Sequence, residues 1–76
     1  MELNLQKNFL HKISIAYKEA RETKYWLRLL LETEMINKEI GNKLLFEIEE
    51  ILRIIGSIQK TTKAKLEAEN IKKNQN

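Results

Sequence analysis

Leucine and isoleucine recur every three or four residues from Phe9 to Ile58 of this 76-residue chain, and no proline interrupts them. Apolar residues at that spacing are typical of amphipathic helices. The periodicity breaks only near Met35 and then restarts, so we expect two long helices joined by a short connection, which makes them antiparallel neighbours. The expected elements are one helical hairpin over residues 1–66, with helices over about 5–32 and 37–66 and a turn at 33–36, and a frayed polar tail over 67–76.

Two such helices carry apolar stripes but cannot enclose a core between them. A chain of this size buries a small fraction of its surface, and this one has no cysteine to staple it. Fully burying a large apolar side chain contributes about 1.5–3 kcal/mol, from which the cost of association is subtracted. We therefore expect an all-α hairpin that self-associates into a four-helix bundle or a larger helical oligomer, with a homodimer as the simplest solution.

The expected contact faces follow from the spacing. The first helix has a coiled-coil-like seam in steps of four and three, namely Phe9, Ile13, Ala16, Ala20, Thr23, Leu27 and Leu30. The second helix carries Ile40, Leu44, Ile48, Ile51, Ile55 and Ile58 on one face, widened by Leu45 and Leu52. Asn4 and Asn37 are expected to cap the two helices, because their short side chains accept bonds from the first N–H groups. Gly41 and Gly56 either permit close packing or are simply tolerated.

A second apolar stripe faces away from these seams. It is formed by Ile15, Trp26 and Leu29 on the first helix and by Phe46 on the second. Isolated apolar residues on a surface are normal. A stripe that includes the single tryptophan favours a subunit contact, because tryptophan is enriched in buried interfaces. These four residues are therefore candidates for an oligomer interface.

Charge is distributed unevenly, although the net charge is only +3. Residues 1–31 hold six Lys or Arg against three Glu, residues 32–59 hold three against six, and residues 60–76 hold five against two. Lys18, Arg21, Lys24 and Arg28 fall on one side of the first helix, with Tyr17 and Tyr25 among them. The anions that neutralise these cations are either acidic side chains of a neighbouring helix or the phosphates of a nucleic acid.

The residues give little support to catalysis or metal binding. His11 is the single histidine, the chain has no Cys or Asp, and no Glu is followed by His three residues later, the pairing that helical di-iron sites need. We expect no enzyme activity, cofactor or small-molecule substrate. The longest apolar runs are far shorter than the roughly 20 residues of a membrane span, and the N-terminus lacks the pattern of a secretory signal. We therefore expect a cytoplasmic protein without membrane contact.

The segment HKISIAYKEARETKYWLRLL at 11–30 resembles the four-helix-bundle family of proteins encoded within intervening sequences of bacterial 23S ribosomal RNA genes. The resemblance continues through the turn at 34–37 and through LLFEIEEILRIIGSIQKTTK at 44–63. It covers roughly residues 7–64 and corresponds to the C-terminal helix pair of that family. The resemblance implies an up-down bundle that assembles as a homo-oligomer, commonly a pentamer, and it implies no enzyme.

The same family is similar to the accessory protein of diversity-generating retroelements, which binds nucleic acid through a basic surface. By position, this resemblance makes Arg21, Lys24 and Arg28 candidates for a basic surface. The first two helices of the family have no counterpart in this sequence. We expect a second hairpin to supply them, either from another chain or from a second copy.

Two hypotheses for function follow. The first is a non-enzymatic, self-associating helical protein that contributes a basic surface to an assembly with RNA or DNA. The alternative is a purely structural module whose partner is another protein helix and which has no affinity for nucleic acid.

Overall fold

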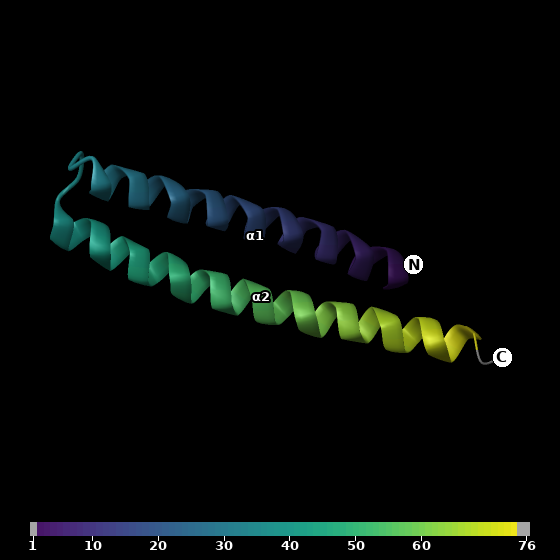
Figure 1. Cartoon of the computed structure of the whole chain (residues 1–76). Helices are drawn as coiled ribbons and strands as arrows, with labels where there is room; N and C mark the ends of the chain where they lie inside the picture. Colours follow the sequence, from purple (N-terminus) through teal and green to yellow (C-terminus); the bar gives the residue numbers. More distant parts are fainter. Residues whose placement is uncertain (1, 75–76) are drawn as a thin grey trace.

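The protein is a hairpin of two long antiparallel helices (Figure 1). The structure is a computed structural model that describes residues 2–74. Helix α1 comprises Glu2–Glu32 and helix α2 comprises Lys38–Asn74. One short turn joins them at one end, and both chain ends lie at the other. The Cα atoms extend over 60 × 15 × 14 Å, so the molecule is a rod two helices wide. The predicted all-α hairpin is confirmed.

Helix α1 ends in a turn that contains no glycine or proline. The N–H of Glu34 donates to the carbonyl of Leu31 at 3.1 Å, and the N–H of Met35 donates to the carbonyl of Leu30 at 2.9 Å. These two bonds form a Schellman motif, which needs a left-handed residue that is usually glycine. Glu34 occupies that position with a φ of 59°. The chain thus reverses without the residue types that mark a turn in a sequence.

Helix α2 begins with the cap that the sequence predicted. The side-chain oxygen Oδ1 of Asn37 accepts hydrogen bonds from the N–H groups of Glu39 at 2.8 Å and Ile40 at 3.2 Å. Two of the N–H groups that a helix start leaves without an intrahelical partner are therefore satisfied. Glu39 also places a negative charge in the first turn, where the helix dipole favours it.

The two glycines of α2 have different roles. A Cβ at Gly41 would stand 2.8 Å from Cγ of Leu31 and 2.9 Å from Cδ1 of Ile36, and Cδ2 of Leu31 would be closer still. Gly41 is buried, so its missing side chain lets the first turn of α2 approach the end of α1. A Cβ at Gly56 would meet only Cε1 of Tyr17, at 3.6 Å. Gly41 therefore permits close packing, whereas Gly56 is tolerated.

The contact between the helices keeps the predicted heptad spacing but in a shifted register. Buried and half-buried positions in steps of four and three are Gln6, Leu10, Ile13, Tyr17, Ala20, Lys24, Leu27 and Leu31 on α1, and Gly41, Leu45, Ile48, Leu52, Ile55, Gln59, Thr62, Leu66 and Glu69 on α2. Phe9 and Thr23 of the predicted seam are exposed. A count of apolar residues misses Tyr17 and Lys24, because such side chains bury their stems and keep their polar tips in water.

The same shift leaves much of the predicted α2 face in water. Ile40, Leu44 and Ile51 are exposed, while Leu45 and Leu52 turn out to belong to the contact with α1. Among the described side chains, Ala20 and Leu66 are the only buried hydrophobic ones, each 8% exposed. The hairpin therefore has a continuous seam but very little interior.

Both helices are longer than predicted. Helix α1 begins at Glu2 and not at Leu5, so Asn4 lies within its first turn and does not precede it as a cap. The turn is also one residue longer than predicted, because α2 begins at Lys38, after its cap. These differences are of the size by which helix ends commonly vary.

The predicted frayed tail differs more strongly from the structure. Residues 67–74 continue α2 as helix, while the remaining residues of that predicted tail, 75–76, lie outside the described part. Leu66 is buried, and the side-chain amide of Gln6 donates to Oε1 of Glu69 at 3.4 Å, so contact with α1 continues past the predicted end. Alanine, glutamate and lysine in this segment are also favourable helix formers. Within residues 2–74, neither helix has an apolar stretch of the length that would cross a membrane.

Candidate nucleic-acid interface

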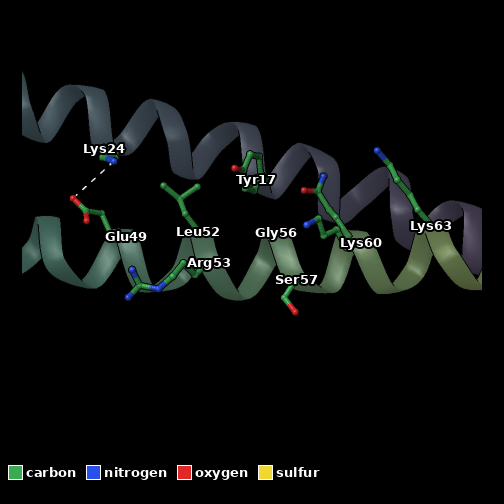
Figure 2. Close-up of a pocket in the computed structure, with 10 residues that line it drawn as sticks. Tyr17, Lys24, Glu49, Leu52, Arg53, Gly56, Ser57, Lys60 and Lys63 are labelled. Carbon is green, nitrogen blue, oxygen red and sulfur yellow. Dashed lines mark ion pairs between the residues drawn. The ribbon is translucent and has the colours of Figure 1, made fainter.

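A groove runs along one side of the hairpin between α1 and α2 (Figure 2). It is lined by Tyr17 and Lys24 of α1 and by Glu49, Leu52, Arg53, Gly56, Ser57, Gln59, Lys60 and Lys63 of α2. An adjoining hollow, which shares Tyr17, Lys24 and Leu52, adds Arg21, Tyr25 and Arg28. We call the two surfaces together the basic groove, because six of these side chains are cationic and one, Glu49, is a carboxylate.

Helix periodicity places these cations in rows. Arg21 and Arg28 are seven residues apart on α1, and Arg53 and Lys60 are seven residues apart on α2. Seven residues are close to two full turns, so each pair projects from the same face of its helix. The antiparallel arrangement sets the two rows along the same groove, and Figure 2 shows Lys60 and Lys63 continuing it beyond Tyr17.

Two of the groove cations are already matched by carboxylates. Nζ of Lys24 lies 3.8 Å from Oε1 of Glu49 across the groove, and both side chains are partly exposed. Arg53 pairs with Glu50, one turn earlier on α2. Among the described side chains, no carboxylate lies within ion-pair distance of the other four groove cations, which are Arg21, Arg28, Lys60 and Lys63.

Tyr17 forms an aromatic surface inside the groove. It is half-buried, and its Cε1 lies 3.6 Å from the point that a Cβ on Gly56 would occupy. Close by, Nε2 of Gln59 donates to Oγ of Ser14 at 3.1 Å, a hydrogen bond that links the two helices at this level. Helix packing and this polar contact therefore fix the place of the tyrosine ring relative to the surrounding cations.

A second aromatic surface lies on the outer side of α1. The rings of Tyr25 and Trp26 meet edge to face, with centroids 5.5 Å apart and planes at 78°. They line a hollow that adjoins the basic groove, together with Ser14, Tyr17, Lys18, Arg21 and Glu22. Lys18 is exposed and belongs to this hollow rather than to the lining of the basic groove.

The structure brings three of the four predicted nucleic-acid-binding residues together. Arg21, Lys24 and Arg28 line the basic groove, and Lys18 lies beside it. Lys24 differs from the others because it is half-buried and paired with Glu49. Whether any of the four binds nucleic acid stays a prediction.

Sequence reasoning missed the contribution of α2. Arg53, Lys60 and Lys63 line the groove, although residues 32–59 hold more Glu than Lys and Arg and the two lysines were counted separately with residues 60–76. The antiparallel register could have revealed them. Pairing Lys24 with Glu49 sets residues 53–63 of α2 opposite residues 10–20 of α1, so the cations of α2 continue the groove from the α1 cations toward the open end.

The four candidates for an oligomer interface are exposed and do not form one surface. The exposed fractions are 47% for Ile15, 57% for Trp26, 37% for Leu29 and 67% for Phe46. Trp26 lies on the outer side of α1 beside Tyr25. Phe46 precedes Arg53 by seven residues and so shares a face of α2 with that groove cation.

The described part of the chain offers few residues for a metal site or for acid–base chemistry. No group of three His, Cys, Asp or Glu side chains that could hold a metal ion occurs there. His11, the single histidine, is exposed. What the described groove offers chemically is a set of positive charges around an aromatic ring, an arrangement suited to polyanions.

The sequence profile of the 23S rRNA-intervening sequence protein family matches residues 1–57. The chain belongs to this family. The match spans α1, the turn and the first half of α2, so the family membership inferred from sequence is confirmed. It includes all the groove cations of α1 together with Arg53, while Lys60 and Lys63 lie beyond it. No curated protein and no solved structure matches the chain.

Proposed function

We propose that this member of the 23S rRNA-intervening sequence protein family is a non-enzymatic, self-associating helical protein that binds RNA or DNA through its basic groove. One observation carries the proposal. Four cations, two from each helix, gather along the groove around the ring of Tyr17, and no carboxylate among the described side chains lies at ion-pair distance from them. We expect this activity in the cytoplasm, since a chain without cysteine is compatible with a reducing compartment.

Phosphate is the ligand that best accounts for such a groove. Rows of like charges at helical spacing repel one another slightly unless an anion offsets them. A nucleic acid offers a line of phosphates, and neutralising them releases condensed counterions, which drives binding. Arg21 and Arg28 have planar guanidinium groups that can hold phosphate oxygens in pairs.

The tyrosines support a single strand over a rigid duplex. Exposed bases of a single strand can stack on an aromatic ring, and such stacking tolerates any sequence. Tyr17 lies within the groove and Tyr25 at its edge, so a strand that follows the cations would meet both rings. The proposal therefore predicts binding with little sequence preference and strong dependence on salt.

Charge reversal tests the proposal. The probes are a labelled 20-nucleotide RNA and the matching DNA, and anisotropy is measured over a series of salt concentrations. We expect Arg21→Glu with Arg28→Glu, and separately Lys60→Glu with Lys63→Glu, to abolish binding while helicity in circular dichroism stays unchanged. The matched control, Lys38→Glu with Lys43→Glu, reverses as many charges outside the groove and should preserve binding. Absence of binding by the unmodified chain at low salt, or binding insensitive to salt, contradicts the proposal.

The alternative function is a module that binds another protein helix. The observation in its favour is the exposure of Trp26 and Phe46, large aromatic side chains that are often central in protein interfaces. This alternative predicts no nucleic-acid affinity and a partner that is lost with Trp26→Ala or Phe46→Ala. The groove variants above would then leave the partner bound, which separates the two functions.

A further inference from the structure

The side of the hairpin opposite the basic groove is apolar. Ile51 follows Glu49 by two residues, Ile58 follows Gly56 by two and Leu30 follows Arg28 by two. Two residues turn a helix by roughly 200°, so each of these side chains projects away from the groove. We call this surface the apolar side, and its large members are Phe9, Leu30, Leu44, Ile51, Ile54 and Ile58.

A single hairpin does not cover this surface. Phe9 is 49% exposed, Leu44 40%, Ile51 44% and Ile54 58%. Both helices contribute, so the apolar side continues from α1 to α2 along most of the rod. Exposed apolar side chains gathered on one side of a molecule favour a contact with another macromolecule.

The acidic and basic side chains beside the apolar side lie toward opposite ends of the hairpin. On α2, Glu47 lies nine residues before Gly56, the midpoint of the helix, and Lys65 lies nine residues after it. Each projects beside the apolar side, because Glu47 precedes Ile51 by four residues and Lys65 follows Ile58 by seven. Both side chains are exposed. The acid therefore lies toward the turn and the base toward the open end of the hairpin.

Helix α1 shows the same order of charges, with the base nearer to the open end and the acid nearer to the turn. Lys12 lies in the half of α1 near the open end, three residues after Phe9, and Glu19 lies seven residues nearer to the turn on the same face. An edge that is basic at one end and acidic at the other is complementary to its own copy turned end for end. It is not complementary to a copy in the same orientation, because the α1 of that copy would bring Lys12 near Lys65 at the open end.

We propose that the apolar side is covered by a second copy of this chain, related by a two-fold axis, with the turn of each hairpin over the open end of the other. The proposal rests on the self-association in the proposed function and names its partner, face and orientation. Each α2 lies against the α2 of the second copy, so Glu47 faces Lys65 of that copy at two equivalent places. The result is a four-helix bundle with one basic groove on each outer side.

This arrangement leaves Ile15, Leu29 and Phe46, which the sequence favoured for subunit contacts, outside the interface between the two copies. Trp26, seven residues after Glu19, lies at the edge of the interface. Phe46→Ala is therefore a matched control, because Phe46 is a large exposed aromatic side chain that shares a face of α2 with the groove cation Arg53.

The test is sedimentation velocity at micromolar concentration and low salt, with circular dichroism on each sample. We expect a dimer for the unmodified chain and for Phe46→Ala. Each single reversal, Glu47→Lys or Lys65→Glu, should raise the dimer dissociation constant about tenfold, because two exposed ion pairs become repulsive. The double variant Glu47→Lys with Lys65→Glu should restore it. If a single reversal also lowers helicity, recovery of both helicity and dimer in the double variant supports the same pairing.

Three results overturn the inference. The first is a helical monomer at this concentration, and the second is a double variant no tighter than the single ones. The third is tighter association by Glu47→Lys, which requires like ends to meet. Nucleic-acid binding by a chain that gives any of these results would leave the groove proposal intact. Conversely, a chain that forms a dimer with the expected charge pairing can still bind no RNA or DNA. That result would contradict only the groove proposal.

Discussion

The ring of Tyr17 lies over Gly56, with Cε1 3.6 Å from the point that a Cβ on Gly56 would occupy. That separation is ordinary van der Waals distance, so the helix contact has room for one methyl group here. The same ring lines the basic groove, and Gly56 lines it from the other helix. One contact thus contributes to the packing of the hairpin and to the shape of the candidate site.

Gly56→Ala should stabilise the protein. Glycine in a helix interior is about 1 kcal/mol less favourable than alanine, and the added methyl group would meet only Tyr17 at normal distance. We expect the free energy of unfolding to rise by about 0.5–1 kcal/mol. Urea denaturation followed by circular dichroism, at one fixed chain concentration, measures it. A lower midpoint would show that the Tyr17 contact is tighter than the structure has it.

Gly41→Ala should have the opposite sign. The same gain in helix propensity is available, but the methyl group would meet Leu31 and Ile36 well inside van der Waals distance. Overpacking of this kind typically costs about 1–3 kcal/mol, which exceeds the gain. We expect a lower denaturation midpoint than that of the unmodified chain. Equal stabilisation by Gly41→Ala and Gly56→Ala would contradict the close approach of α2 to Leu31.

Glu49→Gln should tighten the binding of nucleic acid, if the groove proposal holds. The substitution keeps the size of the side chain but removes the carboxylate that faces Lys24 at 3.8 Å. Lys24 would then be available to phosphate, and Glu49, the one carboxylate among the described residues that line the groove, would be neutralised. Salt titration of RNA binding should show a slope steeper by up to about 0.7, the value for one additional contact to a single strand.

Arg21→Gln and Lys24→Gln compare how much two groove cations contribute to nucleic-acid binding. No carboxylate in the described part of the chain lies at ion-pair distance from Arg21, so its loss should weaken binding more than Lys24→Gln does. The same salt titration measures both variants. Equal effects would mean that the ion pair with Glu49 does not restrain Lys24.

The sequence predicted the hairpin and its heptad spacing because both follow from where apolar residues recur. It did not predict which of two neighbouring faces of α1 meets α2. Phe9 and Leu10, or Leu30 and Leu31, are equally apolar, so composition cannot choose between the two registers. The choice depends on Tyr17 and Lys24, which pack along their stems, and on Gly41, which admits Leu31.

The candidate site was predictable on one helix only. Arg21, Lys24 and Arg28 are visible as a row within α1, since their spacing is local. The contribution of Lys60 and Lys63 depends on the antiparallel register, which brings them beside residues more than 40 positions earlier in the chain. The turn was also invisible in composition, because Glu34 adopts a conformation that usually requires glycine.

Glu34→Gly should stabilise the turn. A left-handed conformation costs a residue with a Cβ about 1–2 kcal/mol, and glycine avoids that cost while losing more freedom on folding. We expect a net gain of about 0.5–1 kcal/mol in the free energy of unfolding. Denaturation in urea measures the gain, and Glu39→Gly serves as control because it puts glycine inside α2, where it should destabilise.

Leu27→Ala and Ile51→Ala together separate the hairpin seam from the contact with a second copy. Leu27 is half-buried in the α1–α2 seam, so its truncation should cost about 2 kcal/mol or more whatever the oligomeric state. Ile51 is 44% exposed on the apolar side and should cost less than about 1 kcal/mol in an isolated hairpin.

A second copy on the apolar side changes the expectation for Ile51. Its side chain would then be fully buried, and Ile51→Ala should cost about 2–5 kcal/mol. The loss should appear as a lower melting temperature and as a smaller dimer fraction in sedimentation, both dependent on chain concentration. A chain in which Ile51→Ala changes neither quantity, while Leu27→Ala lowers the melting temperature, has its apolar side in water.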